Sequence, residues 1–106
     1  MPHNSQPTKP YEDELSYLRS NVNELDKQIL GLLNLRTACI LRIGTIKSEA
    51  GLPVHVPERE EEVLHRLALT NTGPLQNEHL QAIYKVVFES SHALQNKLRE
   101  QKPAQL

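Results

Sequence analysis

Several charged and polar side chains occur at positions where a helix of this chain would otherwise carry, or closely border, apolar ones. They offer cations and hydrogen-bond donors but no nucleophile paired with a base. Such a set suits a small dianion, and a reaction that depends on positioning and electrostatic stabilisation rather than on covalent catalysis. The residues are Arg19, Arg36, Lys47, Arg59, Glu60, Ser91 and Gln95.

Arg36 occupies an apolar position of its predicted helix, between Leu32 and Cys39. A buried and unpaired guanidinium would be costly, so an anion is expected to meet it. Lys47 lies eleven residues further on, close to three helical turns, and projects from nearly the same face. The two cations suggest a buried anion site. Pairing of Arg36 with a structural carboxylate, or extension of its stem toward water, explains Arg36 equally well.

Ser91 and Gln95 continue a stripe that Tyr84 and Phe88 begin, at steps of four, three and four residues. Each has a simpler explanation than a role in binding. Ser91 can be a small residue that permits close helix approach, and Gln95 can lie on an exposed flank.

Other kinds of site find little support. The five histidines are scattered without an H-x-x-x-H pair, and Cys39 is the single cysteine, so we predict no metal site and no cofactor. No spacing singles out a Ser/His/Asp triad, and there is no phosphate-binding glycine loop. Cys39 is interpreted as a small core residue of a protein in a reducing compartment.

Positioning of these residues depends on one long predicted helix, residues 12–50. About 39 helical residues span about 58 Å, whereas a compact chain of this length has a radius of gyration of about 13 Å. Most of its apolar face would meet water in a monomer, so we predict that a second copy covers it. This face, called the apolar seam below, follows alternating steps of three and four residues: Leu15, Leu18, Val22, Leu25, Ile29, Leu32, Arg36, Cys39, Ile43 and Ile46.

Glycine and proline residues along the chain predict two further helices. Gly51 and Pro53 end the long helix, Pro57 opens a short one that ends near Thr70, and a third runs from about 76 to 101. Val56 is a poor N-cap for the short helix because its side chain offers no acceptor. No β-like alternation occurs, so the predicted class is all-α, with a disordered lead-in at 1–10, one helical domain at 11–101 and a frayed tail at 102–106.

Composition limits the partners. With 106 residues the chain has room for one domain, and its net charge of −1 gives no general case for nucleic acid or an anionic membrane. We see no apolar run of signal-peptide or membrane-spanning length and therefore expect a soluble, cytoplasmic protein.

Several motifs together resemble the all-helical class of chorismate mutases over roughly residues 12–100. The strongest likeness is to the mutase domain at the front of bacterial bifunctional chorismate mutase/prephenate dehydratases, without the dehydratase half. The resemblance implies three helices per chain, an intertwined homodimer and two shared active sites. The motifs are Leu18-Arg19, Leu25-Asp26, Leu32-Leu33-x-x-Arg36, Gly44-x-x-Lys47, Pro53-Val54 with Pro57-x-Arg59-Glu60, and Phe88-Glu89-Ser90-Ser91-x-x-x-Gln95.

The resemblance also implies roles in the rearrangement of chorismate, a small dicarboxylate, to prephenate in aromatic amino-acid biosynthesis. Arg36, and Arg19 from the partner subunit, would bind the two carboxylates. Lys47 and Gln95 would donate to the ether oxygen of the breaking bond. The remaining implied roles are a carboxylate contact for Ser91, the ring hydroxyl for Glu60, and added positive charge from Arg59.

Val56 departs from the family pattern, which often has Asp at this position beside the ring hydroxyl. The departure leaves open a mutase of 4-amino-4-deoxychorismate or a pyruvate-lyase acting on isochorismate, both on the same fold. A non-catalytic helical dimerisation module would explain the apolar seam, but not why Arg36, Lys47, Ser91 and Gln95 interrupt or border apolar faces.

Overall fold

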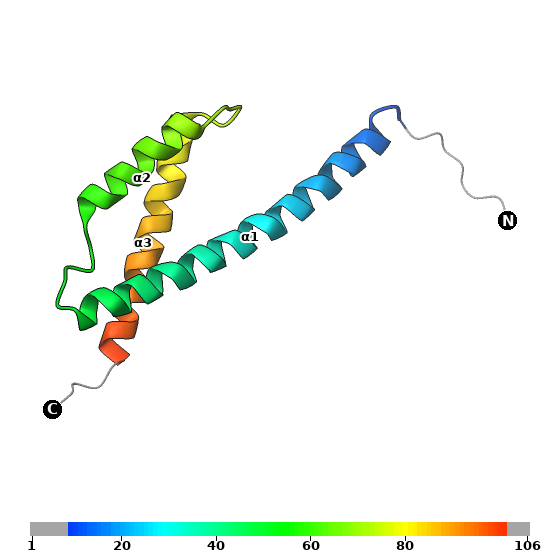
Figure 1. The fold of residues 1–106 in the computed structure, drawn as a ribbon. Coiled ribbons are helices and arrows are strands. Elements are labelled where there is room, and N and C mark those ends of the chain that lie inside the picture. The colour runs from blue at the N-terminus through cyan, green and yellow to red at the C-terminus, as the bar shows by residue number, and fades with distance from the viewer. Residues whose placement is uncertain (1–8, 102–106) are drawn as a thin grey trace. The chain divides into compact units, whose positions relative to one another are not determined.

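The computed structural model describes residues 9–101, which form three α-helices and no strand. These are α1 (Glu12–Glu49), α2 (Pro57–Thr70) and α3 (Asn77–Gln101) (Figure 1). The prediction of an all-α chain with one long, one short and one medium helix is confirmed, with boundaries within a residue or so. The chain divides into two compact units, residues 1–36 and 37–106, and the division falls within α1. Of the predicted lead-in and tail, residues 1–8 and 102–106 lie outside the described part.

The ends of α1 follow from its sequence. Glu12, Asp13 and Glu14 fill the first turn, where carboxylates favour the positive end of the helix dipole. At the other end Gly51 adopts a φ of +71°, which side chains disfavour and glycine tolerates. The backbone N–H of Leu52 then donates to the Lys47 carbonyl at 2.8 Å, and that of Gly51 to Ser48 at 3.2 Å. This pair of bonds is the Schellman ending, which satisfies carbonyls that the helix leaves open.

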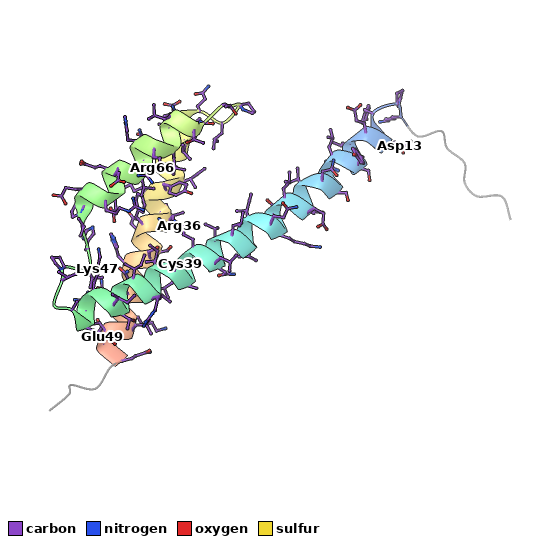
Figure 2. All side chains as sticks on the ribbon, in the orientation of Figure 1. Asp13, Arg36, Cys39, Lys47, Glu49 and Arg66 are labelled. Atoms are coloured by element: carbon purple, nitrogen blue, oxygen red, sulfur yellow. The ribbon has the colours of Figure 1, made fainter. Side chains whose placement is uncertain are left out.

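In the first unit the apolar seam of α1 faces solvent in a single chain. Leu18 is 48% exposed, Leu25 53% and Leu32 65%. Cys39, which we predicted to be a small core residue, is also exposed (Figure 2). That prediction is wrong for the single chain, because none of residues 9–101 covers this position of the seam.

One expectation about membranes needs correction. By length and composition alone α1 is apolar enough to cross a membrane, with an 18-residue window of mean hydropathy 1.5. A search for an uninterrupted apolar run misses it, because α1 spreads its leucines and isoleucines around a few charges. The core helix of a soluble protein meets the same criterion, so the finding carries little weight.

The second unit contains the packed part of the fold. α2 lies alongside α3 (Figure 1). Phe88 of α3 is buried at 8% exposure, and its ring meets that of Tyr84 edge to face with centroids 5.9 Å apart. Asn71 organises the turn between the helices, because its amide donates to the Leu75 carbonyl and to the Asn77 side chain, each at 2.7 Å.

The start of α2 shows the predicted weak cap. Val56 is the N-cap residue, with φ −125° and ψ 98°, and no side-chain hydrogen bond caps the helix. Its carbonyl accepts from the N–H of Arg59 at 3.0 Å, so the backbone already has the conformation of a capping residue. Only the side-chain acceptor is missing.

We therefore predict that Val56→Asp raises the free energy of unfolding by about 1 kcal/mol, because a carboxylate at this position accepts from the first amides of α2. Urea unfolding at matched protein concentration measures the change. Val56→Asn tests the cap without the charge and should recover most of the gain. Equal stability of all three proteins would mean that the first turn of α2 does not limit stability.

Candidate functional site

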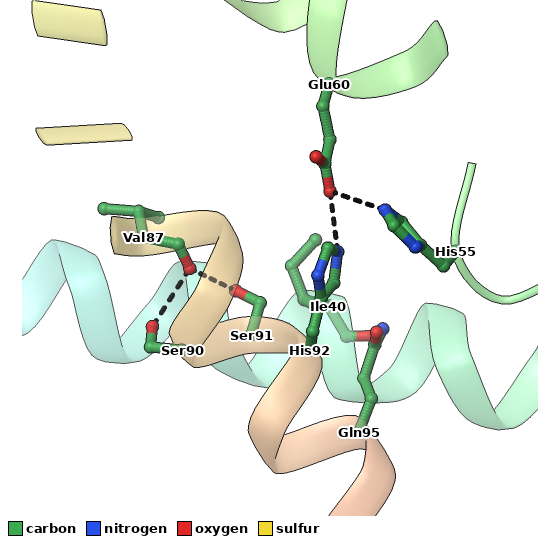
Figure 3. A network of polar contacts seen from close by, with 8 residues as sticks. All are labelled: Ile40, His55, Glu60, Val87, Ser90, Ser91, His92 and Gln95. Carbon is green, nitrogen blue, oxygen red and sulfur yellow. Dashed lines mark hydrogen bonds and ion pairs between the residues drawn. The ribbon is translucent and has the colours of Figure 1, made fainter. Parts of the chain in front are cut away.

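The residues predicted to form a site fall in both units. Arg19 and Arg36 belong to the first, and Lys47, Val56, Arg59, Glu60, Ser91 and Gln95 to the second. Within the second, the structure brings three segments together: the last turns of α1, the start of α2 with the loop before it, and the middle of α3 (Figure 3).

Gln95 is held against the end of α1. Its Nε2 donates to the Ile40 carbonyl at 3.0 Å (Figure 3). The approach is close because Gly44 has no side chain, and a Cβ built there would lie 3.1 Å from Gln95 Nε2. Gly44 is buried, so this contact lies inside the unit. The alternative explanation of Gln95 as a residue on an exposed flank does not hold, because its side chain is half-buried and its amide is hydrogen-bonded to α1.

A pocket of about 180 Å³ adjoins this contact. It includes Gly44 and Gln95 but none of the other predicted site residues. The remaining lining comes from α1, the loop after it and the end of α3: Leu41, Thr45, Ser48, Val54, Leu98 and Arg99. Gln95 is therefore the predicted site residue that lines this pocket.

Lys47 is half-buried on the last turns of α1 (Figure 2). Its ammonium group makes no ion pair with any of residues 9–101. A partly desolvated cation without a counter-charge is unfavourable unless an anion or a strong acceptor joins it. Lys47 is thus the clearest candidate in this unit for binding a negatively charged group.

Ser91 is 5% exposed and is the buried polar residue of α3. Its Oγ donates to the Val87 carbonyl at 3.0 Å, and Ser90 Oγ donates to the same oxygen at 2.9 Å (Figure 3). The burial agrees with a small residue at a close helix approach, and the hydroxyl remains a polar group beside the packed residues.

Glu60 lies at the centre of a cluster that sequence reasoning missed. One of its oxygens, Oε2, is 2.6 Å from Nε2 of His92 and 3.4 Å from Nε2 of His55 (Figure 3). The two imidazole rings are 4.0 Å apart between centroids and tilted by 54°. His55 comes from the loop before α2 and His92 from α3, so no spacing in the sequence could have linked them.

Arg59 points away from this cluster, although it neighbours Glu60 in sequence. Its Nη1 is 3.1 Å from Glu62 Oε1, which also meets Arg66 at 2.6 Å. The three side chains form an exposed network along the solvent face of α2. The structure therefore pairs Arg59 with Glu62 and not with Glu60, and its predicted role of adding positive charge to the site stays a prediction.

In the first unit Arg19 is exposed on α1 and lines an open groove with Glu12, Leu15, Ser16, Ser20 and Asn23. Arg36 is half-buried at the end of this unit. Their predicted roles as carboxylate ligands stay predictions.

Comparisons with known proteins point to one family. A family model described as chorismate mutase type II matches residues 18–96. The bifunctional chorismate mutase/prephenate dehydratase of Aquifex aeolicus is 38% identical over 91 residues, which cover 82% of this chain and 25% of that protein. The chorismate mutase of Methanocaldococcus jannaschii is 27% identical over 90 residues, covering 84% of this chain and 91% of that protein. The chain thus spans about a quarter of the Aquifex bifunctional relative.

Solved structures give the same result. Form II of the chorismate mutase from Thermus thermophilus superposes with a TM-score of 0.76 at 35% identity, covering 78% of this chain and 94% of that one. Chorismate mutase from Helicobacter pylori in complex with prephenate gives a TM-score of 0.79 at 32% identity, covering 87% and 100%.

Proposed function

The chain belongs to the type II chorismate mutase family, and we propose that it converts chorismate to prephenate by a [3,3] rearrangement. The observation that carries the proposal is the pair of donors in the second unit. Lys47 is a half-buried cation that forms no ion pair with residues 9–101, and Gln95 is an amide fixed against α1. The family pattern implies a role for both residues at the ether oxygen.

The chemistry explains why such donors are sufficient. In the rearrangement the C–O bond breaks ahead of C–C bond formation, so negative charge grows on the ether oxygen. Donors that are already in place interact more strongly with that oxygen in the transition state than in the ground state, and this difference accelerates the step. No covalent intermediate and no proton transfer is needed, in keeping with a site that has no paired nucleophile and base.

The contact of Gln95 with α1 suits this role. The amide carries two N–H donors, and the Ile40 carbonyl takes only one of them. The other stays available for a substrate oxygen. Because Gly44 sets how closely Gln95 approaches, the backbone of α1 fixes the position of the donor before substrate binds.

The rest of the proposed site follows the family pattern. Arg36 and Ser91 would hold carboxylates, Glu60 the ring hydroxyl, and Arg59 would add positive charge after turning from Glu62. Arg19 would come from the partner subunit. Arg19 and Arg36 are seventeen residues apart, about 25 Å along a helix, which is too far for both to hold one small molecule from the same chain.

We propose a homodimer for the same reason. Among the described residues Phe88, at 8% exposure, is the buried large apolar side chain, whereas Leu18, Leu25 and Leu32 of the apolar seam stay exposed. A second chain that runs antiparallel along α1 would cover the seam and bring its own Arg19 beside Arg36. The proposed setting is cytoplasmic aromatic amino-acid biosynthesis.

Val56 supports a second candidate, a mutase of 4-amino-4-deoxychorismate. The side chain at the start of α2 is apolar and half-buried, so it does not select a ring hydroxyl over an amine. Incubation with each compound, followed by identification of the product, separates this function, chorismate mutase and the lyase of isochorismate. Turnover of none of the three would leave the helical dimerisation module.

We predict that Lys47→Ala and Gln95→Ala each lower kcat for chorismate by on the order of 10²-fold, by loss of one donor to the ether oxygen. Alanine suits a helix, so the helical circular dichroism spectrum should not change. A variant that keeps near-native kcat would show that its residue has no part in the reaction.

Gly44→Ala should lower kcat by about tenfold without unfolding the protein, because the added methyl displaces Gln95 by a few tenths of an ångström or more. Gly31→Ala is the matched control, since a Cβ at Gly31 meets nothing within 4 Å in the chain. The control should keep its kcat and gain helix stability. An equal effect of both substitutions on kcat would argue against a positioning role for Gly44.

Mixed dimers test the shared site. Arg19→Ala and Arg36→Ala homodimers should both be nearly inactive. When the two are unfolded together and refolded, about half of the dimers are mixed, and each has one intact site, so about a quarter of all sites are restored. Activity should return to near that fraction. If sedimentation shows a folded monomer, or if activity does not return despite subunit exchange, Arg19 does not act across an interface.

A further inference from the structure

His55, Glu60 and His92 converge on one point from three separate segments of the second unit. His55 lies in the loop before α2, Glu60 in the first turn of α2, and His92 in the middle of α3 (Figure 3). Each offers one ligand atom, and the three atoms all lie within 4.8 Å of one another. Such convergence is not a by-product of helical spacing, because no two of these residues share a helix.

Two imidazole nitrogens converge on one carboxylate oxygen in this cluster. Both Nε2 atoms face the same oxygen of Glu60, at 2.6 Å from His92 and 3.4 Å from His55. Bare lone pairs on these nitrogens would repel a carboxylate oxygen so close by, so the arrangement favours a proton or a cation between the three atoms. A single metal ion placed among them can bind both nitrogen lone pairs and the carboxylate oxygen.

We propose that His55, Glu60 and His92 form a binding site for a divalent transition-metal ion such as Zn²⁺, with water at the fourth position. Two imidazoles and one carboxylate form a ligand set that zinc prefers, whereas Mg²⁺ and Ca²⁺ favour oxygen ligands. Around tetrahedral zinc with bonds of about 2.0–2.1 Å, ligand atoms lie about 3.4 Å apart. The separation between His55 and Glu60 is 3.4 Å, and the shorter one to His92 opens by less than 1 Å.

The exposure of the cluster suits exchange of an ion with solvent. The His55 side chain is 53% exposed, while those of Glu60 and His92 are 26% and 29% exposed. Two of the ligands are therefore held by the packing of α2 and α3, and the third closes the site from a loop. An ion can reach this site without unfolding of a helix.

Metal binding has a consequence for activity that rests on the proposed function. Glu60 is the residue expected to accept the ring hydroxyl of chorismate, and a carboxylate bound to zinc through Oε2 is a weaker acceptor for that hydroxyl. Occupancy should thus inhibit the mutase. The site would make the enzyme sensitive to free zinc at a point that does not involve Lys47 or Gln95.

Direct titration of the full chain with Zn²⁺ by calorimetry, in a buffer that does not chelate the metal, tests the site without any assay of activity. One ion per chain is expected. His55→Gln and His92→Gln keep a donor for Glu60 but supply a poor zinc ligand, so each should weaken binding by at least about tenfold. Co²⁺ should give the intense visible bands of a tetrahedral ion, and these should be lost in both variants.

The other histidines provide matched controls. His65 and His79 lie outside the cluster, and His3 lies outside the described residues. The variants His65→Gln, His79→Gln and His3→Gln should all bind zinc as the unchanged protein does. No saturable binding, or equal affinity in both cluster variants and the controls, would overturn the site.

A separate activity arm tests inhibition. Saturating Zn²⁺ should lower kcat/KM at least about tenfold, and His92→Gln should need correspondingly more zinc. Undiminished activity of the zinc-bound enzyme would overturn the inhibitory role. A protein that binds zinc as described but turns over no chorismate would instead overturn the proposed function and leave the site in place.

Discussion

The proposed assembly and the proposed site both depend on one constraint, which is that a single chain leaves the apolar seam of α1 exposed. α1 is a single helix of 38 residues, and its leucines at seam positions remain exposed even though the packed part of the fold is complete. The hydrophobic effect favours a partner on that surface. Because the seam also carries Arg36, whatever covers it meets a cation as well as apolar side chains, so assembly and substrate binding draw on the same surface in the proposed dimer.

Within the second unit the site is built on helices and on backbone contacts. Gln95 is fixed by a carbonyl of α1 at a position where glycine permits close approach. Glu60 is fixed by the packing of α2 on α3 and by its contact with His92. Side chains held in this way lose little freedom on binding, so more of the interaction with the substrate is available to stabilise the transition state.

Helix boundaries were predictable because they depend on local residues. Gly51 with a positive φ, Pro57 at the first turn and the steps of three and four along α1 each act within a few positions. The contacts of the site were less predictable. The pairing of Arg59 with Glu62 depends on which face of α2 meets solvent, and the exposure of Cys39 depends on what covers the seam. Neither follows from spacing.

The cluster around Glu60 shows most clearly that sequence spacing does not predict contacts between distant segments. His55 and His92 are thirty-seven positions apart and look unrelated in the sequence, because ligand spacing detects only sites built on one or two local segments. The tertiary approach of α2 to α3 brings them to one carboxylate. The role of Arg19 came from resemblance alone, and that of Arg36 from its place in the apolar seam together with the resemblance. Both remain predictions, since they depend on a second chain.

The shared acceptor at Val87 has a consequence for how α3 responds to a bound anion. Two serine hydroxyls and the helical N–H of Ser91 all compete for one carbonyl oxygen, which has only two lone pairs. One donor is therefore in excess. Rotation of the Ser91 hydroxyl toward a carboxylate would break a weakened bond and leave no buried acceptor unsatisfied, because Ser90 still serves the carbonyl. The hydroxyl can thus change partners at almost no cost to the stability of the helix.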